Sequence, residues 1–480
     1  MNKCYLYFIA ALLVLSFQQV NAQKTLRIYN NNPEKKSYVM QDTVKHQWIA
    51  GVEVLGLNVL VNRFNFYVRP DTDFSTVSWD SWKANFEHGL EWDWNEFGVN
   101  YLGHPYQGSH YYNSARSLGM NYWASGAYTL LGSATWEWLG ETHPPSGNDL
   151  VNTTMGGMFL GEVMYRFSDR IYDGKAVGFN RVWRESVAFL LNPMRAFNRG
   201  MYGRLKSYEI GPGRVKPLFN GSVSFGGGML SSNTGYEKEG STALLETKLV
   251  YGTPFDERIK KKKPFDYFVL EGWYRVRNDT GKTRHISLSG YANLIMKDIT
   301  GIDEDGNKKR TRHSIGLYHQ YDYLDGGIIE IGSMALTPGL VSDFKLSEKV
   351  KVRTTLMAGP IVLGGSNSEV VCASCNSDDP TDLRDYIMGP GITEKYELLV
   401  DAGKWGILDL KFHRWDIFVA SGPAGRERLN TWIVDYEIPV IKQLYIGARY
   451  LYYDRKAVYD DFDDITKNQD EIRTFITLHF

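Results

Sequence analysis

The C-terminal part of the chain, from residue 203 onward, alternates hydrophobic and polar residues with a period of two. The last segment shows this most clearly, with one face formed by Ile472, Ile476, Leu478 and Phe480 and the other by Arg473, Thr477 and His479. Such alternation is typical of strands that separate two environments. Because every backbone group must be paired inside a membrane, the segments predict a mainly β fold: an antiparallel β-barrel of about twelve strands, within a range of ten to fourteen.

The predicted strands are bounded by turns and by charged stretches. Residues 405–413 and 415–422 are predicted as two separate strands. The stretches 256–263, 299–310 and 454–471 are rich in charged residues, which usually face water. We therefore predict that these three stretches are turns or exposed loops.

Residues 23–202 follow a helical period instead. Asn58, Asn62 and Asn65 recur at i, i+4 and i+7, which places a polar stripe along one face of a predicted helix. This part of the chain is too polar to cross lipid alone. We therefore expect a helical region packed in the lumen of the barrel or at its periplasmic mouth.

Two further helices are predicted in the same region. Ser146 or Asn148 can cap a helix that starts after a pair of prolines. That helix continues into a face of small residues, which permits close contact with another helix. The small residues are Gly156, Gly157 and Gly161. Residues 179–199 predict a helix that breaks or kinks near Pro193, because proline lacks the N–H that a helix needs.

Residues 1–22 have the composition of a secretory signal peptide. Lys3 supplies a positive start, residues 8–17 are mainly apolar, and small residues precede a cleavage point after Ala22. The apolar run is too short to span a bilayer, so we expect cleavage rather than a membrane anchor. The predicted divisions of the chain are thus 1–22, 23–202 and 203–480.

The chain ends on Phe480, which closes the last amphipathic strand. A terminal aromatic residue at this position resembles the recognition signal of outer-membrane barrel assembly, although a soluble edge strand can also end in Phe. Together with the signal peptide, it predicts the outer membrane of a Gram-negative cell as the location. The expected partners are outer-membrane lipid and the barrel-assembly machinery.

The composition agrees with a barrel and argues against a nucleic-acid partner. Aromatic residues make up 14% of the chain, with 31 Tyr and 13 Trp, and the mean hydropathy is −0.34. Membrane barrels need aromatic girdles, and their alternating strands average to a polar composition. A net charge of −1 provides no basic surface for phosphates.

Cys372 and Cys375 are the cysteines that remain after export. In an oxidising compartment they can form a local disulfide. A zinc site would need two more ligands, and a thioredoxin-like motif would need a βαβ setting. Neither is visible in the sequence, and we predict no metal and no cofactor.

Four residues of the helical region are candidates for chemistry: His104, Glu137, Glu141 and Asp149. The two glutamates are spaced to share the face of one helix, and Asp149 opens the next helix. Neighbouring carboxylates raise each other's pKa, as general acid–base catalysis requires, and the histidine can relay a proton or join a metal site. A polar core that merely satisfies its own buried groups is the alternative.

Arg116, Glu162 and Arg166 are candidates for structural pairing. Glu162 and Arg166 are four residues apart on a predicted helix, the spacing of a helical ion pair. Arg116 or Arg166 can also neutralise the carboxylates of Glu141 and Asp149, which would make that cluster structural. Neither a nucleophile elbow nor a phosphate-binding or dinucleotide-binding loop occurs in the sequence.

Residues 45–200 contain five short motifs in order: HPYxG, YYNxAR, GSxxWE, PSxND and GGxxLGE. In these motifs the sequence resembles the domain of unknown function 3943, which occurs in predicted bacterial outer-membrane proteins. The resemblance implies a location and an architecture, and it brings no known reaction.

The sequence is compatible with three classes of function. The first is a barrel of unassigned role, such as a channel or a protein that handles envelope components. The second is an outer-membrane enzyme, a hydrolase or transferase that acts on envelope lipid or glycan through the His/carboxylate cluster. The third is a structural or interaction barrel whose helices plug the lumen.

Overall fold

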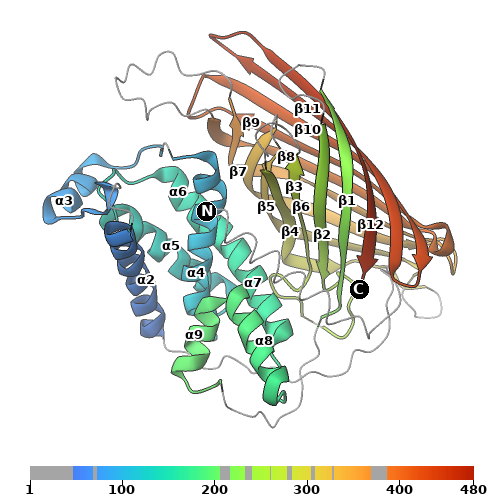
Figure 1. The fold of residues 1–480 in the computed structure, drawn as a ribbon, viewed down its shortest axis with the longest axis horizontal. Coiled ribbons are helices and arrows are strands. Elements are labelled where there is room, and N and C mark those ends of the chain that lie inside the picture. The colour runs from blue at the N-terminus through green and yellow to red at the C-terminus, as the bar shows by residue number, and fades with distance from the viewer. Residues whose placement is uncertain are drawn as a thin grey trace. The chain divides into compact units, whose positions relative to one another are not determined.

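The computed structural model describes residues 47–68, 73–93, 95–205, 217–232, 240–259, 261–277, 284–303, 309–326, 329–368 and 386–480. These residues form two compact units, a helical unit that ends at residue 205 and a barrel unit that begins at residue 217 (Figure 1). The predicted signal peptide, residues 1–22, and the predicted disulfide between Cys372 and Cys375 lie outside the described residues.

The barrel unit is a closed ring of antiparallel strands in which β1 pairs with β12. The strands are β1 (Phe219–Ser232), β2 (Gly240–Tyr251), β3 (Phe268–Arg277), β4 (Arg284–Asp298), β5 (Thr311–Asp325), β6 (Glu330–Lys345), β7 (Lys351–Asn367), β8 (Tyr386–Asp401), β9 (Ile407–Phe418), β10 (Gly425–Ile441), β11 (Leu444–Tyr459) and β12 (Ile465–His479). The predicted antiparallel barrel of about twelve strands is confirmed.

The alternation in the sequence corresponds to the two faces of the barrel wall. On β12 the hydrophobic side chains of Ile472 and Ile476 are exposed on the outer face. The side chains of Arg473, Thr477 and His479, on the opposite face of the strand, are buried in the lumen. A period of two therefore separates an apolar exterior from a polar interior, as the sequence predicts.

Three details of the barrel differ from the prediction. The two strands predicted at 405–413 and 415–422 are one continuous strand, β9. The stretch 454–471 is not an exposed loop, because β11 and β12 extend into it and bury Arg455 and Glu471 in the lumen. Phe480 does not lie on the exposed apolar face: it is buried, with its ring 6.0 Å from that of Phe219.

The helical unit is built from α-helices and from short 3-10 and π-helical segments. Its elements are α2 (Gln47–Val68), η1 (Asp73–Ser75), α3 (Trp79–His88), η2 (Val99–Gly103), α4 (His104–Arg116), α5 (Tyr122–Leu139), α6 (Gly147–Val151), η3 (Asn152–Gly156), α7 (Gly157–Ile171), α8 (Gly178–Leu191) and α9 (Pro193–Met201). Both η2 and η3 are π-helical turns. No helix of the described residues has the length and hydrophobicity needed to cross a bilayer.

Helix starts and stops in this unit follow the sequence signals. Ser146 caps α6, its side chain accepting a hydrogen bond from the Asp149 N–H. The predicted break near Pro193 is also present, since Asn192 ends α8 and caps α9. The polar stripe of α2 is buried, with Asn58 Nδ2 donating to Gly132 O at 3.0 Å.

Helices α4 and α7 approach each other closely through glycines. A Cβ atom on Gly108 would lie 1.9 Å from Thr153 O, and one on Gly157 would lie 2.6 Å from Gly108 Cα. Gly161 similarly faces the ring of Tyr112. The small face predicted from the glycines is thus the contact surface of α7 with α4, and it places His104 and Asp149 next to each other.

Candidate functional site

His104, the first residue of α4, lies against the start of α6. Its Nε2 atom is 3.6 Å from Asp149 Oδ2, and its Nδ1 atom is 3.3 Å from Thr153 Oγ1. Burial lowers the pKa of His104, although the charge of Asp93 acts in the opposite direction. The imidazole is therefore neutral at physiological pH and sits beside a buried carboxyl group.

Glu137, in the last turn of α5, is 1% exposed. The Ser146 backbone N–H donates to Glu137 Oε2 at 2.9 Å, and Oε1 has no hydrogen-bond partner among the described residues. Burial, followed by the charges of Glu141 and Asp149, raises the pKa of Glu137 well above its ordinary value. Burial and the neighbouring charges thus favour the protonated form of this carboxyl group.

Asp149, the third residue of α6, is 2% exposed. Asn148 Nδ2 donates to Asp149 Oδ1 at 3.0 Å. Burial, followed by the charges of Asp93 and Glu141, raises the pKa of Asp149 well above its ordinary value. His104, Glu137 and Asp149 thus converge on one buried polar region, which we call the carboxyl cluster, with Glu141 and Asp93 as its outer members.

Glu141 was predicted to share a helix face with Glu137, and this detail is wrong. Helix α5 ends at Leu139, so Glu141 lies beyond the C-terminal residue of the helix. Its side chain still belongs to the carboxyl cluster, because burial and then the charge of Asp93 raise the pKa of Glu141 to about 8.

Asp93 belongs to the carboxyl cluster and was missed in the sequence. Its segment pairs with the α6 start: Glu91 N–H donates to Pro145 O at 2.9 Å, and Asp93 N–H donates to Asn148 Oδ1 at 2.8 Å. This pairing brings together residues more than fifty positions apart. The one available signal was the density of acidic residues in the EWDWNE stretch.

The predicted arginines neutralise a different carboxylate. Arg116 Nε and Arg166 Nε each lie 2.7 Å from a carboxylate oxygen of Glu162. Among the residues that the structure describes, Glu137, Glu141 and Asp149 have no lysine or arginine partner. The nearby guanidinium groups therefore do not neutralise the carboxyl cluster, and burial favours the protonated forms of its acids.

Glu162 is fully buried and is the centre of an ion-pair triad with two partly buried arginines, Arg116 and Arg166. The Tyr112 hydroxyl group also donates to Glu162 Oε2, at 2.7 Å. Burial raises the pKa of Glu162, but the charges of Arg116 and Arg166 outweigh it, and the net pKa is lowered. Glu162 is thus ionised, and its pairing with Arg166 follows the predicted helical spacing.

No group of three or more His, Cys, Asp or Glu residues within the described ranges has the arrangement of a metal site. The carboxyl cluster brings protonated carboxyl groups next to a neutral imidazole, and this arrangement can store and exchange protons.

The titration of Glu141 predicts a pH-dependent stability of the helical unit. Its folded pKa of about 8 lies above the ordinary 4.5, so the folded state binds the proton more tightly. The stabilisation is complete below the unfolded pKa and is lost as the pH rises through about 8. The pKa of His104 is shifted in the opposite direction, so the stability that His104 contributes is lost only as the pH falls below its ordinary pKa of 6.5. The effect of Glu141 is therefore clearest between pH 6.5 and 9.

We expect Glu141→Gln to remove part of this dependence, on the order of 1–3 kcal/mol between the ends of the window. The free energy of unfolding of the helical unit, measured by urea-dependent proteolysis of the full protein in detergent, tests this. Glu87→Gln, at an exposed helix position, should keep the wild-type profile. An unchanged profile in Glu141→Gln would contradict the assignment.

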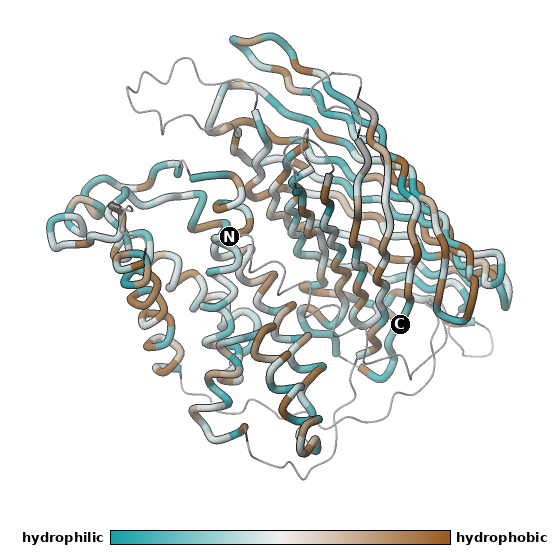
Figure 2. The backbone as a smooth tube through the Cα atoms, in the orientation of Figure 1, coloured by the Kyte–Doolittle hydropathy of each residue, from teal (hydrophilic) through white to brown (hydrophobic). Residues whose placement is uncertain are grey.

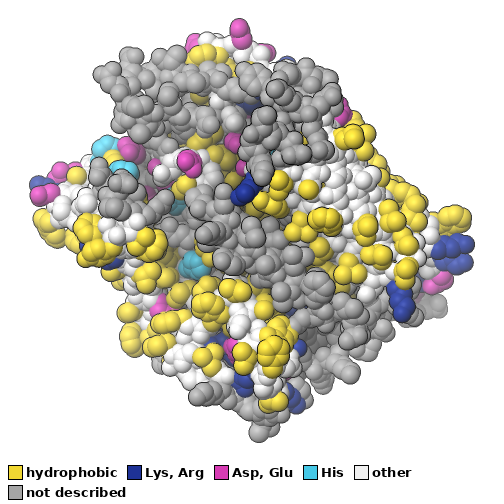
Figure 3. All heavy atoms as spheres, in the orientation of Figure 1, with side chains coloured by type: hydrophobic (Ala, Val, Ile, Leu, Met, Phe, Trp, Pro, Cys, Tyr) yellow, Lys and Arg dark blue, Asp and Glu magenta, His cyan; other side chains and the backbone are white. Residues whose placement is uncertain are grey.

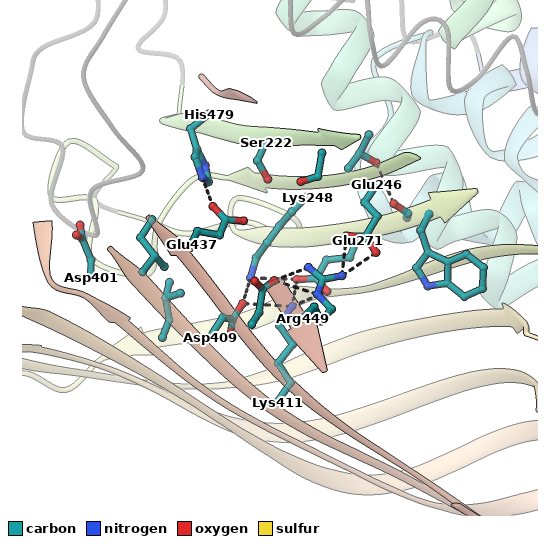
Figure 4. Close-up of a pocket in the computed structure, with 17 residues that line it drawn as sticks. Ser222, Glu246, Lys248, Glu271, Asp401, Asp409, Lys411, Glu437, Arg449 and His479 are labelled. Carbon is teal, nitrogen blue, oxygen red and sulfur yellow. Dashed lines mark hydrogen bonds and ion pairs between the residues drawn. The ribbon is translucent and has the colours of Figure 1, made fainter. Parts of the chain in front are cut away.

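The lumen of the barrel contains a second concentration of charged side chains (Figure 4). Lys248 Nζ lies 3.0 Å from Glu271, 2.8 Å from Glu397 and 3.0 Å from Asp409. Lys411 Nζ lies 2.6 Å from Glu271 Oε1. Two lysines and three carboxylates thus form one network, which we call the lumen network.

The lumen network joins opposite walls of the barrel. Lys248 is on β2 and Glu397 is on β8, which is six strands away in the ring of twelve. Lys411 on β9 and Glu271 on β3 are also six strands apart. Side chains can bridge opposite walls only where the lumen is narrow, so the network constricts the barrel at this level.

Further ion pairs extend the lumen network along the wall. Arg449 on β11 and Arg473 on β12 both bind Glu246 on β2. Arg473 in turn pairs with Glu471, which also lies 3.1 Å from Arg275 on β3. A cavity of about 90 Å³ lies beside these residues.

No curated protein matches the chain. Solved structures with similar folds include the CymD monoaromatic hydrocarbon channel, which is 8% identical over 55% of this chain and 88% of its own, with a TM-score of 0.23. The outer membrane channel DcaP of Acinetobacter baumannii is 10% identical over 55% and 96%, with a TM-score of 0.23. An outer membrane channel from Pseudomonas putida F1 is 8% identical over 57% and 100%, with a TM-score of 0.24.

The family comparison concerns the helical unit. The carboxyl cluster, the Glu162 triad and the α4–α7 glycine contact all lie within residues 89–194. This range matches the family described as Domain of unknown function (DUF3943). Part of the helical unit is therefore similar to the same domain of unknown function that its sequence motifs resemble.

Proposed function

We propose that this protein is an outer-membrane β-barrel that anchors the helical unit at the membrane and whose lumen is closed by its own side chains. The polarity of the barrel wall carries the proposal. On β10, Trp432, Val434 and Ile438 are about half exposed on the outer face, while Asp435 and Glu437 are buried in the lumen. An apolar exterior around a charged interior suits lipid and does not suit water.

The lumen network supports an anchor over an open diffusion pore. A pore needs a continuous aqueous path, and here opposite walls are joined by Lys248 and Lys411. A structural role at the envelope, which includes holding or presenting envelope components, fits a closed barrel joined to a domain with a polar core.

Catalysis is not part of the proposal. His104, Glu137 and Asp149 are 8%, 1% and 2% exposed, so a substrate would find almost none of their surface. A hydrolase or transferase acting on envelope lipid or glycan would need them to line a cavity reached from the surface. Their arrangement is better accounted for as a buried polar core, in which most of the polar atoms are paired inside the helical unit.

Fractionation and folding assays test the location. We expect the protein to fractionate with the outer membrane and to migrate differently on gels before and after heating, as folded barrels do. Recovery as a soluble protein, or a mobility that heat does not change, would contradict the proposal.

Bilayer recordings test the closed lumen. We expect no steady open-channel conductance from the wild-type protein at neutral pH. The double variant Lys248→Met/Lys411→Met removes both bridging cations and leaves Glu271, Glu397 and Asp409 without them. Repulsion among the three carboxylates should open the lumen and give a cation-selective conductance.

The matched control is Lys349→Met/Lys404→Met, which makes the same charge change at exposed positions. It should behave like the wild type. A wild-type conductance as large as that of the double variant would show that the lumen is already open.

A further inference from the structure

The polar face of helix α2 is buried in the helical unit, and its apolar face is exposed at the surface of that unit. Asn58, Asn62 and Asn65 face the interior of the helical unit, where Asn62 Nδ2 donates to Gly140 O at 2.8 Å. The residues on the outer side are between 46% and 74% exposed: Trp48, Val52, Leu55, Val59, Leu60, Phe64 and Tyr67. This is the reverse of an ordinary helix at the surface of a water-soluble protein.

Helix α5 extends the same surface. It packs beside α2, with Asn58 Nδ2 donating to Gly132 O and to Thr135 Oγ1. Its outward residues Trp123, Leu130 and Leu131 are 56%, 50% and 42% exposed. We call the outward residues of the two helices the α2–α5 wall. Figure 2 shows α2 coloured largely as hydrophobic, and Figure 3 shows hydrophobic side chains where α2 meets the surface.

The α2–α5 wall has no charged side chain at its exposed positions on α2. The two charged residues of α2 are turned away from the exposed face: Glu53 accepts a hydrogen bond from Asn198, and Arg63 donates to Ser75 O. A protein partner usually meets a polar rim and about one hydrogen bond per 100–200 Å². Apart from the tips of Trp and Tyr, the exposed face of α2 offers neither.

The residue types on the wall favour lipid as the occupant. Trp48 and Tyr67 stand near the two ends of α2, and between them the exposed residues are mostly Val and Leu. Trp and Tyr prefer the membrane interface, where the ring is in apolar surroundings and the polar tip remains hydrated. A helix with one polar face and one face of Trp, Phe and Leu can lie in the interface with its apolar face toward the acyl chains.

We propose that the α2–α5 wall lies against the hydrocarbon boundary of a lipid bilayer, with the polar side of α2 packed on the helical unit. The contact is monotopic: the helices lie on the bilayer and do not cross it. The helical unit then has a membrane contact of its own, in addition to the covalent link to the barrel.

Site-directed fluorescence tests this contact. Single cysteines replace Val52, Leu55 or Val59 in full-length protein that also carries Cys4→Ser, Cys372→Ser and Cys375→Ser. Each variant is labelled with an environment-sensitive nitrobenzoxadiazole probe and reconstituted into phosphatidylcholine vesicles. We expect blue-shifted emission, loss of emission when doxyl-labelled lipid is added, and little loss with aqueous iodide.

Two control positions make the result specific. Lys83→Cys on α3 carries the probe at a side chain that is 68% exposed and polar, so iodide should quench it and doxyl lipid should not. Ile446→Cys carries it on the outer face of β11, where doxyl lipid should quench it. Failure at Ile446 would overturn the proposed membrane barrel and not the α2–α5 wall.

The proposal is overturned if the three α2 probes behave like the Lys83 probe while the Ile446 probe is quenched by lipid. It is also overturned if the α2 probes are protected from both quenchers. That second outcome would mean that protein covers the wall, either a second copy of the chain or another part of the same chain.

Discussion

Replacing Glu162 with glutamine is expected to destabilise the helical unit by about 3–5 kcal/mol, the range for breaking a buried ion pair. Glu162 is 0% exposed and lies between Arg116 and Arg166. Glutamine retains the shape and loses the charge, so it leaves two guanidinium groups of the interior without their counter-ion. The free energy of unfolding, followed by urea-dependent proteolysis of the full protein in detergent, measures the loss.

Glu87→Gln is the matched control for this variant. Glu87 also pairs with a cation four residues away on a helix, since Lys83 Nζ lies 3.7 Å from Glu87 Oε1, but both side chains are more than two-thirds exposed. An exposed pair of this kind contributes about 0.3–0.5 kcal/mol. Equal effects of the two substitutions would show that burial of the Glu162 triad does not determine its contribution.

Gly108→Ala is expected to destabilise the helical unit by about 3 kcal/mol or more, the upper end of the range for overpacking. The added Cβ atom would lie 1.9 Å from Thr153 O, a backbone atom that cannot rotate away. Helices α4 and α7 would have to separate, which would also pull His104 away from Asp149. The same unfolding measurement reports the loss.

Gly56→Ala provides the control with the opposite sign. Gly56 is inside helix α2, and a Cβ atom there meets nothing within 4 Å. Alanine is favoured over glycine within a helix by about 0.5–1 kcal/mol, so this variant should be neutral or slightly more stable. A neutral Gly108→Ala would show that the α4–α7 contact has room for a methyl group.

The barrel could be predicted from the sequence because its two faces meet different environments. On β12 the alternation matches the structure at Ile472 and Ile476, which are exposed, and at Arg473 and Thr477, which are buried. On β11 the match is partial, because Ile446 is exposed but the hydrophobic Leu451 is buried in the lumen. The stretch 454–471 was misread as a loop for a physical reason. Charged side chains are usually exposed to water, but Arg455 is buried in the lumen, where it pairs with Glu427 at 3.2 Å.

The candidate site could be predicted only where contacts are local or follow helix periodicity. The Glu162–Arg166 pair follows from a spacing of four residues. Asp93 was missed because a bridge to the start of α6, distant in sequence, brings it to the carboxyl cluster. The lumen network was missed for the same reason, since Lys248 and Glu397 are 149 positions apart. The placement of the helical unit in the lumen of the barrel or at its periplasmic mouth stays a prediction. The cleavage of the signal peptide after Ala22 also stays a prediction.

The pairing of β1 with β12 has a consequence for the order of folding. The side chains of Ser224 on β1 and Thr477 on β12 are in contact although they are 253 positions apart in the sequence. Each of the two strands has an unpaired edge until it pairs with the other. Every partly formed sheet therefore exposes two unpaired edges, and the ring can be sealed only when all its strands exist. Gly226 and Gly228 lie on this seam, where a Cβ atom would meet carbonyl oxygens of β12 at 2.1 Å and 2.7 Å. The sealing step thus depends on a nearly bare stretch of β1, and a single side chain added there would obstruct the last event of assembly while leaving the earlier pairings intact.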